Sequence, residues 1–374
     1  MKRILIFGGS GAMGSHLAPL LCNDNTVFVT TRAERTSDQI NYIQGDAHNA
    51  EFLHKILSEQ WDCIIDFMHY STEEFRLRAD VLLAAAEHYV FISSARVYAD
   101  SNEPITENSP RLLDVCTDSE YLSSDEYALA KARCEDILRS KPVNNWTIVR
   151  PSITYSENRL QLGASEKEDW LYKAIHGRPI IFSHDLMQKI TTMTYAGDVA
   201  KGIAALICNQ NAFGEAFHIV GNDHMQWSEV LDIYRDVLEN DGKWQGVYLS
   251  DTSWNIRYKS KWQVLYGRYF NRVLDNSKIA KFVDVSTFKK MNEGLEMCLK
   301  AFLKNPVFMY DEDIENLHRL YETELRVGFC EIHGADVDKR FDILEKQVEY
   351  LKLQIENLRK QNTRRNLWKK LILK

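Results

Sequence analysis

Short hydrophobic runs alternate with helical patterns along the first 155 residues. An apolar run over residues 4–7 leads into a glycine-rich turn, and apolar residues at helical spacing follow it. Further strand-like runs cover residues 26–30, 41–43, 63–67, 89–92 and 146–149. Helical patterns cover residues 75–88 and 125–139. Strands that alternate with helices predict an α/β fold with a doubly wound parallel sheet, covered by helices on both faces.

The pattern becomes irregular after Pro151. A helix is expected near residues 167–176, and extended segments near 179–182 and 216–220. We therefore expect residues 1–155 to form the first domain, completed by segments near 190–220. Residues 156–330 are expected to form a smaller, mixed substrate-binding region.

Hydrophobic residues recur at alternating spacings of four and three between residues 337 and 362. This heptad pattern predicts a C-terminal coiled coil. Leucines at every seventh position favour a parallel homodimer, and Asn362 would set its register. The alternative is an amphipathic helix that folds back on its own domain.

The last twelve residues, 363–374, combine lysines and arginines with Trp368 and several leucines. This composition suits an anionic membrane surface, so we expect peripheral attachment at the inner face of the membrane. The alternative is a solvated tail. From Arg359 onward there are seven basic residues and no acidic one, which leaves 39 − 53 = −14 for the rest of the chain.

Composition narrows the class of protein. The chain has 374 residues, of which 45% are hydrophobic and 26% charged, so it is not intrinsically disordered. Its seven cysteines are scattered without any CxxC, which argues against a disulfide framework or a metal site. No apolar stretch reaches the roughly 18 residues that span a bilayer, and a strand follows Met1-Lys2-Arg3 directly. We expect a cytoplasmic protein that binds no nucleic acid.

Glycines at a spacing of three, in the pattern GxxGxxG, lie between the first predicted strand and helix. Gly8, Gly11 and Gly14, with Ser10 and Met13 in the same turn, allow backbone amides to approach a pyrophosphate at a helix N-terminus. The spacing predicts a dinucleotide-binding domain of the Rossmann type. The alternative is a tight turn without a ligand.

The end of the second predicted strand bears on the choice of cofactor. A carboxylate there binds the ribose 2′-hydroxyl of NAD, whereas arginine accommodates the 2′-phosphate of NADP. The chain has Thr31-Arg32 with Arg35 close behind, so NADP is favoured over NAD, unless Arg32 is only a solvated charge. Asp46 and Ala47, after the third strand, are placed to meet the adenine, although Asp46 also suits a simple turn.

Tyr127 and Lys131 are four residues apart on a predicted helix, so their side chains share one face. A free phenol titrates near pH ~10 and is a poor base at neutral pH, and a nearby cation favours its ionised form. Ser94, at the end of an earlier strand, would hydrogen-bond the substrate oxygen. We predict Ser94, Tyr127 and Lys131 as catalytic residues. The alternative is that Tyr127 and Lys131 share an exposed helix face by chance.

Taken together, these motifs resemble the extended short-chain dehydrogenase/reductase family, the NAD-dependent epimerases, dehydratases and ketoreductases of nucleotide sugars. The likeness spans roughly residues 1–305. It rests on the three glycines, Asp46, SSARVY at 93–98, PITE at 104–107, YALAK at 127–131, Arg150-Pro151, YAGDV at 195–199 and DNSK at 275–278. The resemblance implies hydride transfer at a sugar carbinol or ketone, with Met68, His69 and Pro151 beside the cofactor. We expect His69 to form a wall of that site rather than to transfer protons.

The sequence departs from the family at two places. The 4,6-dehydratases carry Asp-Glu after the catalytic Ser or Thr, where this chain has Ala95-Arg96, so dehydration is disfavoured. Many members also hold a phosphate with an arginine where this chain offers only Lys189. We expect Arg96, Lys189, Arg268 and Arg272 as substrate-binding candidates, the last two for a diphosphate. The alternatives are surface charges, or a substrate that is not a nucleotide sugar.

These observations predict an NADP-preferring sugar oxidoreductase, either a nucleotide-sugar 4-ketoreductase or an epimerase. The sequence does not separate the two reactions. Two other hypotheses are that the protein is a non-catalytic NADP-binding scaffold or an RNA-binding member of the superfamily. The complete set Ser94, Tyr127 and Lys131 argues against the first, and the charge of −14 argues against the second.

Overall fold

The computed structural model describes residues 1–250, 261–309, 315–316, 319 and 322–323. Residues Met1–Tyr310 form one compact unit and Asp311–Lys374 a second. The predicted coiled coil, 337–362, and the basic tail, 363–374, lie outside the described residues.

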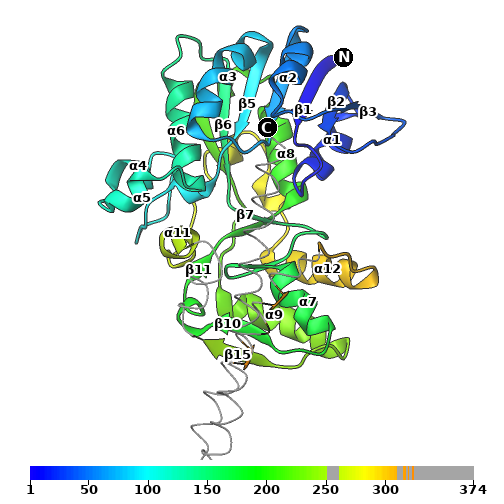
Figure 1. Cartoon of the computed structure of the whole chain (residues 1–374), viewed down its shortest axis with the longest axis vertical. Helices are drawn as coiled ribbons and strands as arrows, with labels where there is room; N and C mark the ends of the chain where they lie inside the picture. Colours follow the sequence, from blue (N-terminus) through cyan, green and yellow to red (C-terminus); the bar gives the residue numbers. More distant parts are fainter. Residues whose placement is uncertain (251–260, 310–314, 317–318, 320–321, 324–374) are drawn as a thin grey trace, which may run out of the picture. The chain divides into compact units, whose positions relative to one another are not determined.

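A seven-stranded parallel sheet forms the centre of the first unit (Figure 1). Its strands, in spatial order, are β13 (Glu215–Ile219), β6 (Trp146–Pro151), β5 (Ala86–Ile92), β4 (Trp61–Asp66), β1 (Lys2–Phe7), β2 (Asn25–Thr31) and β3 (Ile40–Gln44). From β1 the chain adds β2 and β3 on one side of the sheet, and it then crosses to β4 and continues outward on the other side. Sheets of this kind bind ligands at such a reversal, outside the carboxyl ends of the strands. The predicted doubly wound α/β fold is confirmed.

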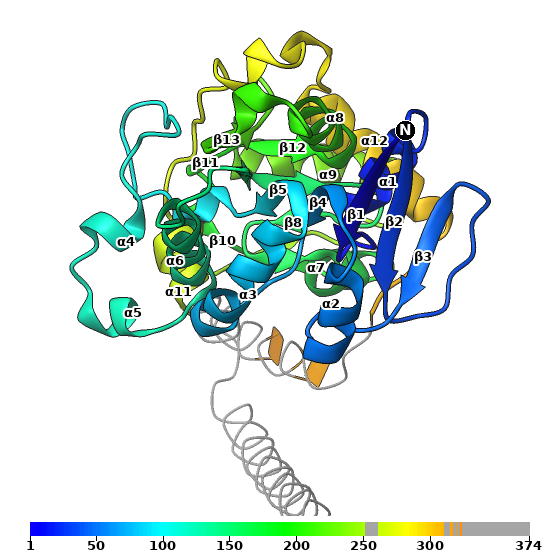
Figure 2. The ribbon, with the colours of Figure 1, turned by 90° about the horizontal axis from the view of Figure 1, so that it is seen from above.

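Helices cover both faces of this sheet. One face carries α2 (Ala50–Leu57), α3 (Thr72–Ala84) and α6 (Tyr127–Arg139), and the other carries α1 (Gly14–Leu21) and α8 (Ala196–Leu206). Figure 2 shows α3 and α6 on one side and α8 on the other. Strand β1 explains the two layers, because Leu5 and Phe7 enter one core while Ile4 and Ile6 enter the other.

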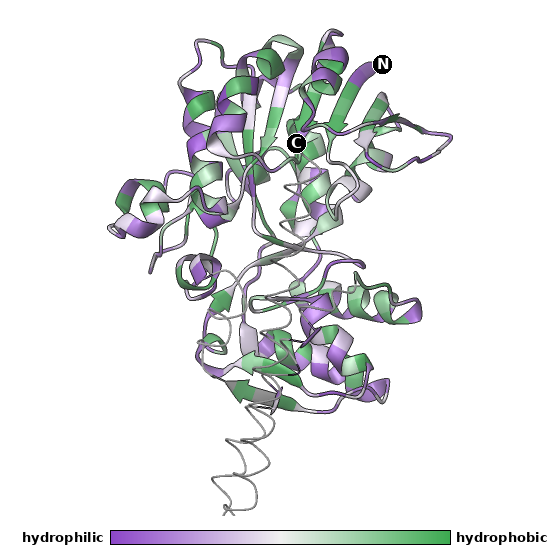
Figure 3. Ribbon diagram, viewed as in Figure 1, coloured by the Kyte–Doolittle hydropathy of each residue, from purple (hydrophilic) through white to green (hydrophobic). Residues whose placement is uncertain are grey.

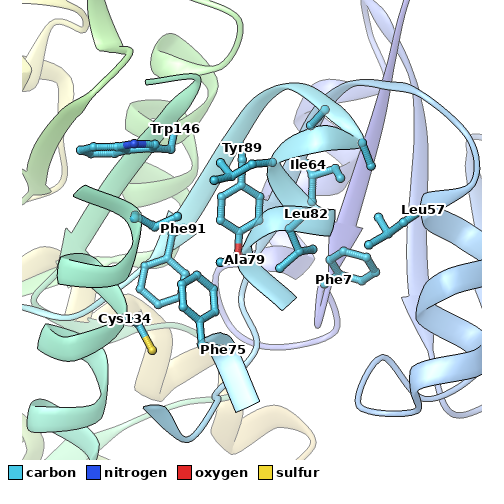
Figure 4. Close-up of a cluster of buried hydrophobic side chains, with 14 of the residues drawn as sticks. Phe7, Leu57, Ile64, Phe75, Ala79, Leu82, Tyr89, Phe91, Cys134 and Trp146 are labelled. Carbon is cyan, nitrogen blue, oxygen red and sulfur yellow. The ribbon is translucent and has the colours of Figure 1, made fainter. Parts of the chain in front are cut away.

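The core under α3 is built largely from aromatic and aliphatic side chains (Figure 4). Phe75 of α3 lies 4.9 Å from Phe91 of β5, measured between ring centroids. Ile64 and Tyr89 come from neighbouring strands and are fully buried. Burial of this kind, at about 25 cal/mol per Å² of apolar area, fixes the helices onto the sheet.

A smaller region follows β6 in the chain and has a core of its own, which includes Trp170, Trp227 and Leu295. Its strands are β7 (Ile153–Tyr155), β8 (Gln161–Leu162), β9 (Ser165–Glu166), β10 (Ile180–Ser183), β11 (Ile190–Thr191), β12 (Met193–Tyr195), β14 (Met225–Gln226) and β15 (Val247–Ser250). Its longer helices are α7 (Lys167–Ile175), α9 (Trp227–Asn240) and α12 (Met291–Lys304). Figure 3 shows both apolar and polar residues along α12, and the buried apolar residues of α9 and α12 belong to this core, as in amphipathic helices.

Short helices complete the chain. They are α4 (Leu112–Val115), α5 (Ser119–Ser123), α11 (Lys261–Gln263), the π-helical turn η4 (Val264–Arg268), and the 3₁₀ turns η1 (Ala95–Val97), η2 (His184–Leu186), η3 (Gln210–Ala212), η5 (Ile279–Lys281) and η6 (Val285–Thr287). Among the described residues, no helix is long and apolar enough to cross a membrane.

The helix expected over residues 75–88 is wrong at its C-terminal end. Helix α3 stops at Ala84, and β5 begins at Ala86. Ala86 and His88 have helical or neutral propensity, but they pair with Trp61 and Cys63 of β4. Sheet pairing therefore outweighs the weak local preference.

Candidate active site

A cavity of about 360 Å³ lies where the carboxyl ends of the strands meet the smaller region. The side chains of Ser94, Tyr127 and Lys131 all line it, as do Met13 and Pro151. Its other polar or charged lining residues are His69, Ser93, Arg96, Ser152, Thr154, Arg159, Gln161, Thr191, Gln263, Arg268 and Arg272. The structure thus brings the predicted catalytic residues into one cavity.

The glycine-rich loop joins β1 to α1. Gly8 has a φ of +68°, a backbone conformation that favours glycine. A side chain on Gly14 would lie 2.5 Å from the backbone of Gly9, so the helix packs closely on the loop. A Cβ on Gly11 would meet no atom within 4 Å, and no side chain caps α1 at Met13. This open approach to a helix N-terminus fits a dinucleotide pyrophosphate.

The residues expected near the adenosine lie at the ends of β2 and β3. Arg32 and Arg35 are exposed after β2, which ends at Thr31. Asp46 follows β3, and its carboxylate accepts a hydrogen bond from His48 N at 3.0 Å. Ala47 beside it is buried. The turn at Asp46 and an adenine contact are compatible, because only one of the carboxylate oxygens is used.

Ser94 and Tyr127 come from two separate elements. Ser94 ends the loop after β5, is 9% exposed and caps η1 by accepting from Arg96 N at 3.2 Å. Tyr127 is the first residue of α6, and Glu126 caps that helix. Because Lys131 follows one turn later, its side chain points into the same cavity as the phenol.

The ammonium of Lys131 is fixed in place. It is 2% exposed and donates to Ile92 O at 2.7 Å and to Met68 O at 2.9 Å. Ile92 is the last residue of β5, and Met68 follows β4 by two residues, so both carbonyls lie at the carboxyl ends of neighbouring strands. A buried ammonium with two fixed acceptors is a rigid positive charge at the wall of the cavity.

His69 and Arg96 both lie against the ring of Tyr127. The His69 ring stacks on Tyr127, and the Arg96 guanidinium lies 5.3 Å from the Tyr127 ring centroid. Burial, and then the charge of Lys131, lower the pKa of His69 below its ordinary value of 6.5. His69 is therefore neutral at pH 7.

Two further arginines reach the cavity, Arg268 at the end of η4 and Arg272 four residues later. Arg268 is 7% exposed, and its Nε donates to Gly163 O at 2.9 Å. Arg272 donates to the carbonyls of Tyr98 and Ala99, at 2.9 Å each. Burial is the main reason why the pKa of Arg268 falls to about 9 and that of Arg272 to about 10.

The structure separates the substrate candidates. Arg96, Arg268 and Arg272 line the cavity, whereas Lys189 does not and instead lies 5.8 Å from the Tyr269 ring. Its neighbours Ile190 and Thr191 line the cavity in its place.

Sequence reasoning missed Arg159 and Gln161, which reach the cavity from the turn before β8 and from β8 itself. No motif marks them, because their position depends on how β8 pairs with β9. Among the described residues, no group of His, Cys, Asp or Glu could hold a metal ion.

A model of the NAD dependent epimerase/dehydratase family matches residues 4–220. A UDP-glucose 4-epimerase from Neisseria meningitidis serogroup B is 29% identical, over 29% of this chain and 42% of that protein. A second UDP-glucose 4-epimerase, from Neisseria meningitidis serogroup A, matches over the same shares at 29% identity. The chain thus spans less than half the length of the curated relatives it matches.

Solved structures share the fold. An epimerase from Methanothermobacter thermautotrophicus has a TM-score of 0.63 at 18% identity, covering 81% of this chain and 93% of that one. A dTDP-glucose 4,6-dehydratase from Bacillus anthracis, in complex with NAD, has a TM-score of 0.63 at 16% identity, covering 82% and 97%. A UDP-glucuronic acid 4-epimerase from Bacillus cereus, in complex with UDP-glucuronic acid and NAD, has a TM-score of 0.59 at 15% identity, covering 81% and 99%.

Proposed function

Because the chain belongs to the NAD dependent epimerase/dehydratase family, we propose that it transfers a hydride at one carbinol carbon of a nucleotide sugar, as a 4-epimerase. The observation that carries this proposal is the meeting of Ser94, Tyr127 and Lys131 in the cavity beside the glycine loop. The curated relatives are UDP-glucose 4-epimerases, which supports position 4 of the sugar. A 4-ketoreductase uses the same residues and is the alternative that the experiment below distinguishes.

The proton steps fall to Tyr127 and Ser94. Tyr127 exchanges a proton with the carbinol oxygen, and Ser94 Oγ hydrogen-bonds the same oxygen and orients it. Lys131 places a buried positive charge in the same cavity as the phenol. The glycine loop and Lys131 would hold a nicotinamide dinucleotide, which would supply the reversible acceptance of hydride.

Dehydration lacks the groups it needs. Elimination of water requires an acid and a base next to Ser94, and Ala95 offers neither. Arg96 is a cation whose Nη2 donates to Glu126 Oε1 at 2.6 Å. The cavity therefore supports oxidation and reduction rather than loss of water.

Arg268 and Arg272 are assigned to the substrate diphosphate. Of the other cavity arginines, Arg96 pairs with Glu126 and Arg159 with Glu166. Across the described part of the chain, neither Arg268 nor Arg272 has a carboxylate within 4.0 Å. Two guanidinium groups without a carboxylate in direct contact match the two negative charges of a nucleoside diphosphate sugar.

NADP is assigned as the preferred cofactor. Thr31 ends β2 without a carboxylate, and Arg32 and Arg35 are exposed directly after it. Guanidinium groups at this position accommodate a 2′-phosphate. Two of the solved structures named above are complexes with NAD, so the proposed preference for NADP rests on this chain's own residues.

The C-terminal segment is assigned to assembly and to membrane contact. The heptads of residues 337–362 support a parallel homodimer, and the basic, apolar residues 363–374 support binding to an anionic membrane surface. Two tails in one dimer bind a surface more tightly than one, because the second contact is intramolecular.

The test combines native mass spectrometry with turnover. A 4-epimerase retains oxidised cofactor through purification and converts UDP-glucose to UDP-galactose without added reductant. Tyr127→Phe abolishes that conversion, at a loss of about 10²–10⁴-fold, while the bound dinucleotide remains. An empty protein that reduces a 4-keto nucleotide sugar with NADPH identifies the ketoreductase instead, and full activity of Tyr127→Phe contradicts both.

A further inference from the structure

An ion pair connects the two segments that carry Ser94 and Tyr127. Arg96 lies in η1, two positions after Ser94, and Glu126 directly precedes Tyr127. The 2.6 Å bond between them joins residues that are 30 positions apart. It therefore spans two elements that the local chain does not hold together.

This pair is largely withdrawn from water. The side chains of Arg96 and Glu126 are 16% and 10% exposed, whereas those of the surface pair Arg235 and Asp232 are 39% and 54% exposed. Exposed ion pairs are screened and contribute little, but a buried, charge-assisted bond is a strong geometric restraint. Removal of one buried partner leaves the other charge uncompensated.

Both partners are anchored to the backbone beside the proposed catalytic residues. Oε2 of Glu126 accepts from Ala128 N at 2.9 Å and caps the helix that begins at Tyr127. Arg96 N donates to Ser94 Oγ at 3.2 Å. A shift of either partner therefore changes the separation of Ser94 and Tyr127.

We infer that the Arg96–Glu126 ion pair sets the position of Ser94 relative to Tyr127, with Arg96 and Glu126 as positioning residues. The inference rests on the proposed function, because neither residue is given a chemical step of its own. Proton transfer requires heavy atoms about 2.6–3.2 Å apart. A misplacement of about 1 Å costs about 10²-fold in rate.

The pair also keeps Arg96 away from the diphosphate. Arg96 is close enough for its charge to contribute, after burial, to the lowered pKa values of Arg268 and Arg272. Glu126 directs the Arg96 guanidinium toward α6. Without Glu126, the Arg96 guanidinium becomes a third cation that can attract the anionic substrate, beside Arg268 and Arg272. We therefore expect substrate binding not to weaken, although the catalytic rate falls.

The test is a double-mutant cycle in the full chain, with UDP-glucose as the probe. Glu126→Gln keeps the helix cap but removes the charge, and it is expected to lower kcat at least about 10-fold without raising KM. Arg96→Gln has a similar effect, and the double variant loses no more than either single one. Arg96→Lys restores part of kcat, because it keeps the charge.

A matched control removes another ion pair of the same length at the far end of the same helix. Lys141 follows α6 and bonds Asp80 of α3 at 2.6 Å, so Lys141→Gln leaves kcat unchanged. If Tyr127→Phe is inactive while Glu126→Gln keeps kcat within about twofold of the wild type, the positioning role is wrong and the proposed function stands. If Tyr127→Phe stays fully active, the proposed function fails first.

A second readout needs no turnover. Amide hydrogen exchange in residues 94–98 and 127–131 reports how firmly the two segments are held. Glu126→Gln and Arg96→Gln are expected to speed exchange in both segments, and Lys141→Gln in neither. Unchanged exchange in either segment overturns the inference, whatever substrate the protein uses.

Discussion

The imidazole ring of His69 stacks on the phenol ring of Tyr127, with ring centroids 5.2 Å apart and planes 20° from parallel. A stacked ring restrains the phenol and keeps water from one of its faces. Since burial and Lys131 keep His69 neutral at pH 7, its contribution is one of shape.

The first prediction concerns this stacked pair. His69→Phe retains an aromatic ring and is expected to keep kcat within about threefold, with an unchanged pH profile. His69→Ala removes the wall and is expected to lower kcat about 10-fold or more. A steady-state pH series on both variants checks this. Loss of one limb of the profile in His69→Phe would instead assign proton transfer to His69.

The second prediction separates substrate binding from stability at Arg268. Burial lowers the pKa of this arginine to about 9. The folded protein thus disfavours the positive charge of Arg268, which the proposed binding of the substrate diphosphate requires. Arg268→Gln is expected to raise KM for UDP-glucose at least about 10-fold, since a charged hydrogen bond is lost. The thermal midpoint stays the same or rises, because an uncompensated buried charge is removed. A fall in Tm with unchanged KM contradicts the assignment.

The third prediction is a pH dependence of stability from His88. This residue is fully buried, its Nδ1 accepts from Cys208 N at 2.8 Å, and its Nε2 lies 2.8 Å from Thr147 Oγ1. Burial, and then the charge of Lys2, lower the pKa of His88 from 6.5 to about 4. Protonation of Nδ1 would turn an acceptor into a donor that faces another donor.

Between about pH 4 and 6.5 the unfolded chain therefore binds more protons at His88 than the folded protein does. The contribution of neutral His88 to the free energy of unfolding is fully present above about pH 6.5. It falls by about 3 kcal/mol as the pH drops to about 4. Urea unfolding across this range measures the slope, and His88→Gln should flatten it. An equal slope in both proteins assigns the loss to other groups.

The fourth prediction addresses the cofactor. Replacing both Arg32 and Arg35 by Ser removes the two exposed guanidinium groups after β2. We expect the Kd for NADPH to rise at least about 10-fold while that for NADH changes less than about threefold. Titration of the intrinsic fluorescence measures both constants. Equal loss for both dinucleotides removes the argument for NADP.

The fifth prediction concerns the basic tail. The full chain is expected to sediment with anionic phospholipid vesicles, less so at high salt, whereas a chain that ends at residue 362 stays in the supernatant. Neutral vesicles serve as the control. Equal sedimentation of both chains with anionic vesicles contradicts the membrane role.

Patterns among residues close together in the sequence predicted much of the fold. The continuous apolar run of β1 and the spacing of Gly8, Gly11 and Gly14 depend only on neighbours in the sequence, so both could be predicted. The spacing of Tyr127 and Lys131 places both on one helix face for the same reason, and both line the cavity. The position of Ser94 followed from the end of its strand, because ligands bind at the carboxyl ends of parallel strands.

Contacts between distant segments were beyond such patterns. The start of β5 at Ala86 depends on its pairing with β4, and Lys189 misses the cavity because Ile190 and Thr191 face it. Arg96 was visible as a departure from the dehydratases, but its partner Glu126 was not. Sequence alone predicted the alternation of strands and helices, the glycine loop and the shared helix face of Tyr127 and Lys131, since these follow from short-range geometry. Only the tertiary structure decided which arginines reach the cavity and which carboxylates neutralise them, because burial and pairing arise when remote segments pack together.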